Sequence, residues 1–159
     1  MNRIGFGFDS HRFEAGRPLV LCGVKIPHEK GLAGHSDGDA VLHAVIDALF
    51  GAAGLPDIGE QFPNTDPKWK GADSGALLTE AIAALAQMGW GVVNCDVTVI
   101  AEEPKLLPHK SAMKERLADL LGLDPVAVSI KAKTNEGMGA IGRGEGLAAY
   151  AVIMLEESQ

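Results

Sequence analysis

Three side chains in the first third of the sequence have the types and spacing of a metal site. Asp9 and His11 stand two residues apart in a stretch with alternating apolar residues, so in a strand their side chains share one face. His43 is spaced by four from both Asp39 and Asp47, which places these three on one polar face of a predicted helix. One carboxylate and two imidazoles make a three-ligand set that suits a catalytic zinc with an open fourth position. Two surface histidines beside ordinary acids are the alternative.

The segment that leads into that helix, residues 34–39, has the composition of a phosphate site. Exposed amides at the start of a helix attract phosphate, and His35 and Ser36 can add donors. A plain helix cap, with Asp37 or Asp39 as the capping acid, is an equal alternative. His35, Ser36 and Asp37 do not indicate a hydrolytic triad, because triad members meet in space from separated segments.

A second polar segment, residues 133–137, follows a predicted strand. The Thr134 hydroxyl beside the Glu136 carboxylate can hold phosphate and a hard cation such as Mg²⁺, while a simple turn is the alternative. The glycine-rich residues 142–146 lack the Lys-Ser/Thr pair of a P-loop. The short Gly5-x-Gly7 pattern lacks the third glycine of a dinucleotide fingerprint, so neither nucleotide motif is present.

Hydrophobic periodicity predicts the elements that must position these side chains. The stretches expected to be extended are residues 4–11, 18–27, 93–99, 126–130 and 147–155. The helices are expected to begin at Asp39, at Asp73 or Ser74 and at Pro108, and the first and third to end near Gly51–Gly54 and Gly122. Residues 55–71 are rich in Pro, Gly and Asp and predict a long irregular loop, which is often functional.

This order predicts an α+β fold, a two-layer sandwich with a mixed sheet and helices on one face, as a single domain over residues 1–159. Residues 147–155 are apolar on both faces, which indicates a central strand or a subunit contact. Because the helices are too few to cover both faces of the sheet, we expect another subunit on the second face.

Composition and charge indicate which kinds of ligand the protein can bind and where it functions. The chain has 159 residues, which fits one domain. Its 14 Lys and Arg against 21 Asp and Glu give a net charge of −7, which argues against nucleic acid and suggests that metal ions supply positive charge to a phosphorylated substrate. Cys22 and Cys95 resemble small core residues of a protein in a reducing compartment. With no signal-type segment and no membrane span, the sequence predicts a cytosolic protein.

The polar segments together resemble one family along nearly the whole chain. Each segment alone is weak, but their order and spacing are highly specific. The segments are residues 3–5, 8–11, 35–39 with His43, 57–59, 62–67, 70–74, 101–105, 134–136 and 142–146. In these the chain resembles the 2-C-methyl-D-erythritol 2,4-cyclodiphosphate synthases of the non-mevalonate isoprenoid pathway.

The resemblance implies a homotrimer with active sites between neighbouring subunits. It implies that Asp9, His11 and His43 hold zinc, and that Glu136 holds a second divalent ion, Mg²⁺ or Mn²⁺. His35 and Thr134 would be the catalytic residues that stabilise the transition state, and residues 101–107 of the neighbouring subunit would hold cytidine. The further implied substrate contacts are Ser36, Asp57, Ile58, Gly59, Phe62, Pro63, Asn64, Thr65, Asp66, Ala101, Pro104, Lys105, Leu106, Leu107, Lys133, Asn135, Ala140 and Arg143.

Three positions depart from the usual pattern of the family. Asn64 stands where an acid is common, Gly137 replaces a common lysine, and Ala140 replaces a common aromatic residue. Members of the family can bind isoprenoid diphosphates in a cavity on the trimer axis, around positions that match Arg143 and Glu145. The smaller Ala140 therefore bears on the shape of that cavity and leaves the chemistry untouched.

The implied reaction is an intramolecular phosphoryl transfer. It converts 4-diphosphocytidyl-2-C-methyl-D-erythritol 2-phosphate to 2-C-methyl-D-erythritol 2,4-cyclodiphosphate and CMP. No protein nucleophile is needed, which agrees with the lack of a convincing Ser or Cys arrangement in the sequence. Two other functions stay open: a zinc-dependent phosphohydrolase, and a non-catalytic trimer that binds isoprenoid diphosphates.

Overall fold

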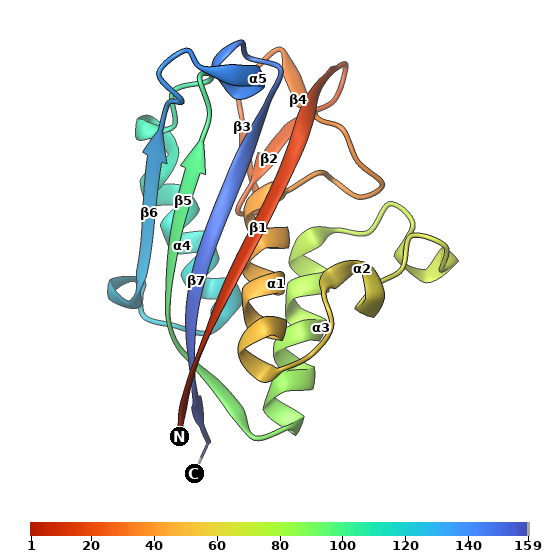
Figure 1. The fold of residues 1–159 in the computed structure, drawn as a ribbon, viewed down its shortest axis with the longest axis vertical. Coiled ribbons are helices and arrows are strands. Elements are labelled where there is room, and N and C mark those ends of the chain that lie inside the picture. Colours follow the sequence, from red (N-terminus) through yellow and green to blue (C-terminus); the bar gives the residue numbers. More distant parts are fainter. Residues whose placement is uncertain (159) are drawn as a thin grey trace.

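A five-stranded sheet forms the centre of the structure, a computed structural model that describes residues 1–158 (Figure 1). The strands are β1 (Asn2–Ala15), β2 (Leu19–Leu21), β3 (Val24–Ile26), β4 (Lys30–Leu32), β5 (Trp90–Ile100), β6 (Val128–Lys133) and β7 (Gly146–Glu157). The α-helices are α1 (Ala40–Ala53), α2 (Ile58–Gln61), α3 (Ser74–Gln87), α4 (Lys110–Leu121) and α5 (Gly139–Gly142). Three short 3₁₀ helices are η1 (Pro67–Trp69), η2 (Leu107–His109) and η3 (Pro125–Ala127).

The sheet is mixed, as the sequence predicts. Its strand order is β4-β1-β7-β5-β6, and the β5–β6 pair is parallel while the other pairs are antiparallel. Strand β7 lies in the middle and pairs along most of its length with β1 and β5. This confirms the central strand that the apolar residues 147–155 predict.

Helices α1, α3 and α4 cover one face of the sheet (Figure 1). Helix α1 packs on β1 and β7, and two glycines of β1 let its backbone approach closely. A Cβ atom on Gly5 would lie 1.8 Å from the carbonyl oxygen of Ala48, and a Cβ atom on Gly7 would lie 1.9 Å from that of Ala44. No side chain fits at either position, so the strand and the helix are held at backbone distance.

The opposite face of the sheet is apolar and uncovered in the single subunit. Ile4, Phe6 and Phe8 alternate along β1 with exposed fractions of 73%, 62% and 46%. The ring centroid of Tyr150 on β7 lies 5.0 Å from that of Phe8, so aromatic side chains of both strands join in one patch. The alternation along β1 predicts an apolar face, and the structure turns that face away from the helices.

The ends of the main helices follow the local chemistry of the sequence. Asp39 caps α1 by accepting a hydrogen bond from the Leu42 amide at 3.1 Å, and Gly54 ends that helix in the left-handed conformation. Asp73 caps α3 through the Gly75 amide at 2.7 Å, and Gly122 ends α4 with a positive φ. The predicted caps of α1 and α3 and the predicted end of α4 are confirmed.

Several predicted elements are wrong in detail. Residues 18–27 are not one extended stretch but two short strands that form the separate β2–β3 hairpin, and it is β4 that pairs with β1. Residues 55–71 contain α2 and η1, because Asp57 and Asp66 cap those short helices with their side chains. Val126 lies in η3 and is 85% exposed, so β6 begins only at Val128. None of the described helices is long and apolar enough to cross a membrane.

Candidate metal centre and adjoining pocket

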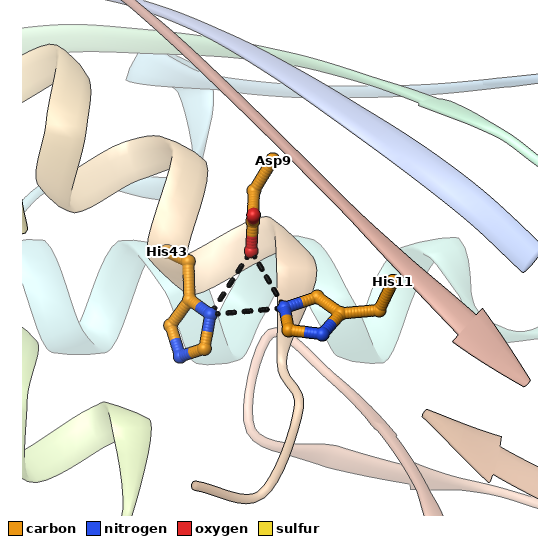
Figure 2. Close-up of side chains that lie close together, drawn as sticks. All are labelled: Asp9, His11 and His43. Carbon is orange, nitrogen blue, oxygen red and sulfur yellow. Dashed lines mark hydrogen bonds and ion pairs between the residues drawn. The ribbon is translucent and has the colours of Figure 1, made fainter. Parts of the chain in front are cut away.

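Asp9 and His11 of β1 meet His43 of α1 at one point between the sheet and the helix (Figure 2). One ligand atom of each residue can be chosen so that all three lie within 4.8 Å of one another. Asp9 Oδ2 lies 2.8 Å from His11 Nε2 and 3.0 Å from His43 Nδ1. Both strand residues are on the side of β1 that carries Gly5 and Gly7, and so they point toward α1.

The other ring nitrogen of each histidine is already occupied by a hydrogen bond. His11 Nδ1 donates to the carbonyl oxygen of Ala33, which can only accept. His43 Nε2 lies 3.1 Å from Ser36 Oγ and 2.9 Å from Ser74 Oγ. The nitrogens that remain, Nε2 of His11 and Nδ1 of His43, both face Asp9.

The three converging atoms fit a metal ion. Burial opposes the ionisation of Asp9, but hydrogen bonds and charge from both histidines outweigh it and lower the pKa of Asp9 to about 2. Burial acts to lower the pKa of His11, but the hydrogen bond and the charge of Asp9 outweigh it and raise that pKa. Either a proton or a metal ion can therefore be bound between these three atoms. One carboxylate oxygen with two imidazole nitrogens is a donor set that zinc prefers.

A pocket of about 210 Å³ opens beside this cluster. Six of the predicted substrate contacts outside the cluster line it: His35, Ser36, Ile58, Gly59, Phe62 and Asn64. Gly34, the first residue of the predicted phosphate segment, also lines it, as do Trp69 and Leu77, which sequence reasoning missed as site residues. The Trp69 ring packs edge-on against Phe62 with centroids 4.7 Å apart, and an aromatic residue inside a polar loop is the one signal that pointed to it.

The α2 wall of the pocket is fixed by two acids. Asp57 caps α2 through the Glu60 amide at 3.0 Å, and Asp47 of α1 accepts from the Ile58 amide at 2.8 Å. Other predicted contacts lie away from this pocket. Asp66 caps η1, Pro63 and Thr65 do not line the pocket, and Asp57 borders a separate hollow next to Phe6 and Phe8.

The predicted cytidine and second-metal residues lie at the opposite edge of the sheet. The strand register aligns Asp9 with Ala149, Ala149 with Val99, and Val99 with Ala132. Three strand spacings therefore separate Asp9 from Ala132, or about 14 Å between their backbones. Residues 101–107 and 133–136, which adjoin β5 and β6, line no part of the pocket beside His43.

The loop after β6 is organised by a residue that sequence reasoning did not single out. Glu102 Oε1 accepts hydrogen bonds from the amides of Asn135 at 2.7 Å and Gly137 at 3.3 Å. Between them Glu136 adopts a positive φ of 53°, and its amide donates to Thr134 Oγ1 at 3.2 Å. The Glu136 side chain is exposed, so its carboxylate is available to a ligand outside the subunit.

Ala140 in α5 and Arg143 directly after it do not line the pocket. Ala140 lines a hollow of about 370 Å³ together with Phe8 and Tyr150. Arg143 pairs with Glu145 at 3.1 Å in the exposed loop that follows α5. Neither of these two predicted contacts lines the pocket beside the metal cluster, although His11 also borders the hollow of Ala140.

Residues 2–156 match the family model described as the YgbB family. The chain belongs to this family. A 2-C-methyl-D-erythritol 2,4-cyclodiphosphate synthase from Symbiobacterium thermophilum is 59% identical over 152 residues, which are 96% of this chain and 97% of that protein. A synthase of the same name from Chromobacterium violaceum is 56% identical over 158 residues, covering 99% of this chain and 100% of that protein.

Two solved structures of proteins with similar names or ligands are similar to this chain along nearly its whole length. A 2C-methyl-D-erythritol-2,4-cyclodiphosphate synthase described as a CDP-bound form has a TM-score of 0.91 at 43% identity, covering 97% of this chain and all of that one. The Plasmodium falciparum protein in a CDP complex has a TM-score of 0.87 at 31% identity, covering 99% of this chain and 97% of that one. The resemblance that the sequence motifs carry is confirmed.

Proposed function

We propose that the chain carries out its reaction in a site built from two halves, a metal half from one subunit and a nucleotide half from its neighbour. The activity is that of a 2-C-methyl-D-erythritol 2,4-cyclodiphosphate synthase, a phosphorus–oxygen lyase that releases CMP. The observation that carries the assignment is the full-length match together with the Asp9, His11 and His43 cluster beside a pocket.

The reaction needs positioning more than covalent chemistry from the protein. An oxygen of the 2-phosphate of the substrate attacks the β-phosphorus of the cytidine diphosphate arm. The new P–O bond closes the cyclic diphosphate, and the bond from the β-phosphorus to the bridging oxygen breaks, so that CMP leaves with its electron pair. Holding both phosphates in line for this attack can contribute on the order of 7–11 kcal/mol.

Asp9, His11 and His43 would hold zinc at the head of the pocket. The ion, when bound, supplies positive charge to the phosphate oxygens, which a chain of net charge −7 otherwise lacks. His35 and Ser36 line the pocket next to this cluster and would donate hydrogen bonds to the same phosphates. The methylerythritol would lie against α2, where Ile58 and Gly59 form the wall.

The nucleotide half would come from the neighbouring subunit. Residues 101–107 would hold cytidine, Thr134 would contact the phosphates, and Glu136 would hold a second divalent ion, Mg²⁺ or Mn²⁺. This division is supported by the separation of the two sets at opposite edges of one sheet, and by relatives solved with CDP. The uncovered apolar face of β1 and β7 supports a homotrimer as the assembly that joins the halves.

Phosphorus NMR of the purified protein with the cytidylylated, phosphorylated substrate and Mg²⁺ tests this proposal. We expect the signals of a cyclic diphosphate and of CMP to grow together, and we expect His43→Ala to form neither. His28→Ala is the matched control, because His28 packs on Phe13 away from the cluster. A ring-opened hydrolysis product, or binding without release of CMP, would contradict the proposed reaction.

A further inference from the structure

Two successive buried hydrogen bonds lie behind His43, on the side away from Asp9. His43 Nε2 lies 2.9 Å from Ser74 Oγ, and Ser74 Oγ is in turn bonded to a carboxylate oxygen of Asp37. Ser74 is the first residue of α3 and is 0% exposed. These hydrogen bonds therefore connect α3 and the loop before α1 to the ring nitrogen of His43 that faces away from the metal cluster.

The directions of these bonds follow from the chemistry of Asp37. A carboxylate can only accept, and that of Asp37 accepts from the Ser74 amide at 3.1 Å, from the Ser74 hydroxyl and from the Asp39 amide at 3.1 Å. The single hydroxyl hydrogen of Ser74 is thus used by Asp37. Its oxygen can only accept from His43, so the hydrogen must be on Nε2 of that ring.

A hydrogen on Nε2 decides what the other nitrogen can do. With Nε2 donating to Ser74, the Nδ1 atom of His43 presents its lone pair toward Asp9 and His11 whenever the ring is neutral. We propose that Asp37 and Ser74 are positioning residues, which fix the tautomer and orientation of His43 and so raise the affinity of the site for its metal ion. The inference rests on the proposed function only for the identity of that ion as zinc.

Ser36 also approaches His43 Nε2, at 3.1 Å, but it cannot replace this pair. Ser36 lines the pocket, so its hydroxyl is within reach of a bound phosphate, whereas Ser74 does not line the pocket. When Ser36 donates to substrate, the bond to Ser74 is the one that keeps the ring in place. Ser74 therefore holds the His43 ring with and without substrate, whereas Ser36 can turn its hydroxyl from the ring to the substrate.

Zinc affinity, measured by competition with a chromophoric chelator at fixed pH, tests the proposal directly. We expect Ser74→Ala to bind zinc about 10- to 100-fold more weakly than the wild type, the loss typical of a missing outer-shell partner. Thr79→Val is the matched control, because it removes a hydroxyl that bonds to the Gly75 carbonyl on the same helix without reaching His43. That control should bind zinc within about twofold of the wild type.

A second pair of variants keeps the test decisive if loss of Ser74 harms folding. Asp37→Asn removes the charge that orients Ser74, and Asp73→Asn changes an acid that bonds only to the same helix end. We expect Asp37→Asn, but not Asp73→Asn, to lower the affinity for zinc and to alter the visible spectrum of the cobalt-substituted protein. Equal zinc affinity in Asp37→Asn and Asp73→Asn, or in Ser74→Ala and Thr79→Val, would overturn the proposal.

The product assay separates this inference from the proposed function. Wild-type protein that binds zinc but forms no cyclic diphosphate contradicts the reaction and leaves the comparison of affinities valid. In the working enzyme, we expect added zinc to restore most of the turnover of Ser74→Ala, because its ligands are intact. A variant that held zinc as tightly as the wild type and still lost turnover would overturn the positioning role.

Discussion

At the residue scale, the metal cluster depends on what each ring nitrogen does on its far side. His11 is held by a backbone carbonyl and His43 by two hydroxyls, so each ring has one nitrogen left for the cluster. Asp9 is the one acid among the three candidate ligands, and its low pKa keeps it ionised across the neutral range. The cluster thus presents three oriented donor atoms, one of them a carboxylate oxygen, before any cation binds.

Glu136 is the residue on which the two-metal proposal depends. Its side chain is exposed. Glu102 holds the amides on either side of it, so the left-handed backbone at Glu136 is fixed and with it the position of the Cα atom from which the side chain extends. Glu136→Gln keeps the volume but removes the charge that attracts a hard cation. We expect the variant to fold and retain zinc while losing most CMP release at ordinary Mg²⁺, with partial recovery as Mg²⁺ is raised.

The measurement is CMP release across a Mg²⁺ titration. Glu115→Gln serves as control, since Glu115 is exposed on α4 and contacts none of the proposed site. Turnover of Glu136→Gln at the wild-type rate over the whole titration would mean that Glu136 is only a turn residue, and the second ion would have to be held elsewhere.

Part of this residue-scale picture was predictable from the sequence. The spacing of two in a strand puts Asp9 and His11 on one face, and the spacing of four puts His43 on the polar face of α1. Ser74 and Glu102 were not predictable as partners, because their bonds join segments 31 and 33 residues apart in the chain. Periodicity describes one element at a time, and such contacts depend on how two elements are placed.

At the element scale, Asp39 joins the β2–β3 hairpin to the start of α1. Its carboxylate accepts from the amides of Cys22 at 3.1 Å, Gly23 at 2.7 Å and Leu42 at 3.1 Å. Cys22 and Gly23 both have positive φ, as the two central residues of a tight hairpin turn require. Asp39 is fully buried, and His43 follows one turn later on the helix that this contact holds.

The buried carboxylate gives the fold a specific pH dependence. Burial raises the pKa of Asp39 from its ordinary value of 3.8 to about 6. The native state therefore binds the proton more tightly than the unfolded chain, and the stability that this provides is lost as pH rises from about 4 to about 6. Relative to Asp39→Asn, which still caps the helix, we expect the wild type to lose up to about 3 kcal/mol across that window.

Chemical unfolding of both proteins between pH 4 and pH 7.5, on the order of eight points, measures this difference. Titration of the other groups is common to the two proteins and cancels in the comparison. Parallel stability profiles for the wild type and Asp39→Asn would show that the buried carboxyl does not titrate in this range.

The elements themselves were predicted better than their pairing. The three long helices, the caps of α1 and α3 and the central β7 follow from periodicity and from the residues at their ends, whereas α4 begins at Lys110 and not at Pro108, which lies in η2. The β2–β3 hairpin was predicted as one extended stretch, because apolar residues continue through its turn at Cys22 and Gly23. The short α2 was missed because one turn of helix held by Asp57 and Asp47 leaves no periodic signal.

At the scale of the whole molecule, a single subunit holds the two halves of the proposed site at opposite edges of its sheet. A site assembled between subunits can be tested at ordinary Mg²⁺ by mixing two variants that each lose most or all activity, His43→Ala and Glu136→Gln. After dissociation and reassembly, each site draws its halves from two subunits chosen at random. We expect activity to return to about one quarter of the wild-type level, because half of the metal halves and half of the nucleotide halves are intact.

The control for that experiment is the same mixture without dissociation, which should keep only the residual activity of the two separate variants. Sedimentation equilibrium on the reassembled protein should give the mass of three subunits. A monomer at micromolar concentration, or mixed trimers without recovered turnover, would mean that the site does not form between subunits.

The close approach of β1 to α1 makes the metal cluster sensitive to substitution at Gly7. Any residue larger than glycine at position 7 would have to move α1 outward by at least about 1 Å, because a Cβ atom there lies 1.9 Å from the Ala44 carbonyl oxygen and such contacts are essentially never under 3.0 Å. His43 is the neighbour of Ala44, and it would move with the helix away from Asp9 and His11. A screen for null alleles would therefore return substitutions at Gly7 alongside those at the three ligands, although Gly7 has no side chain with which to bind anything.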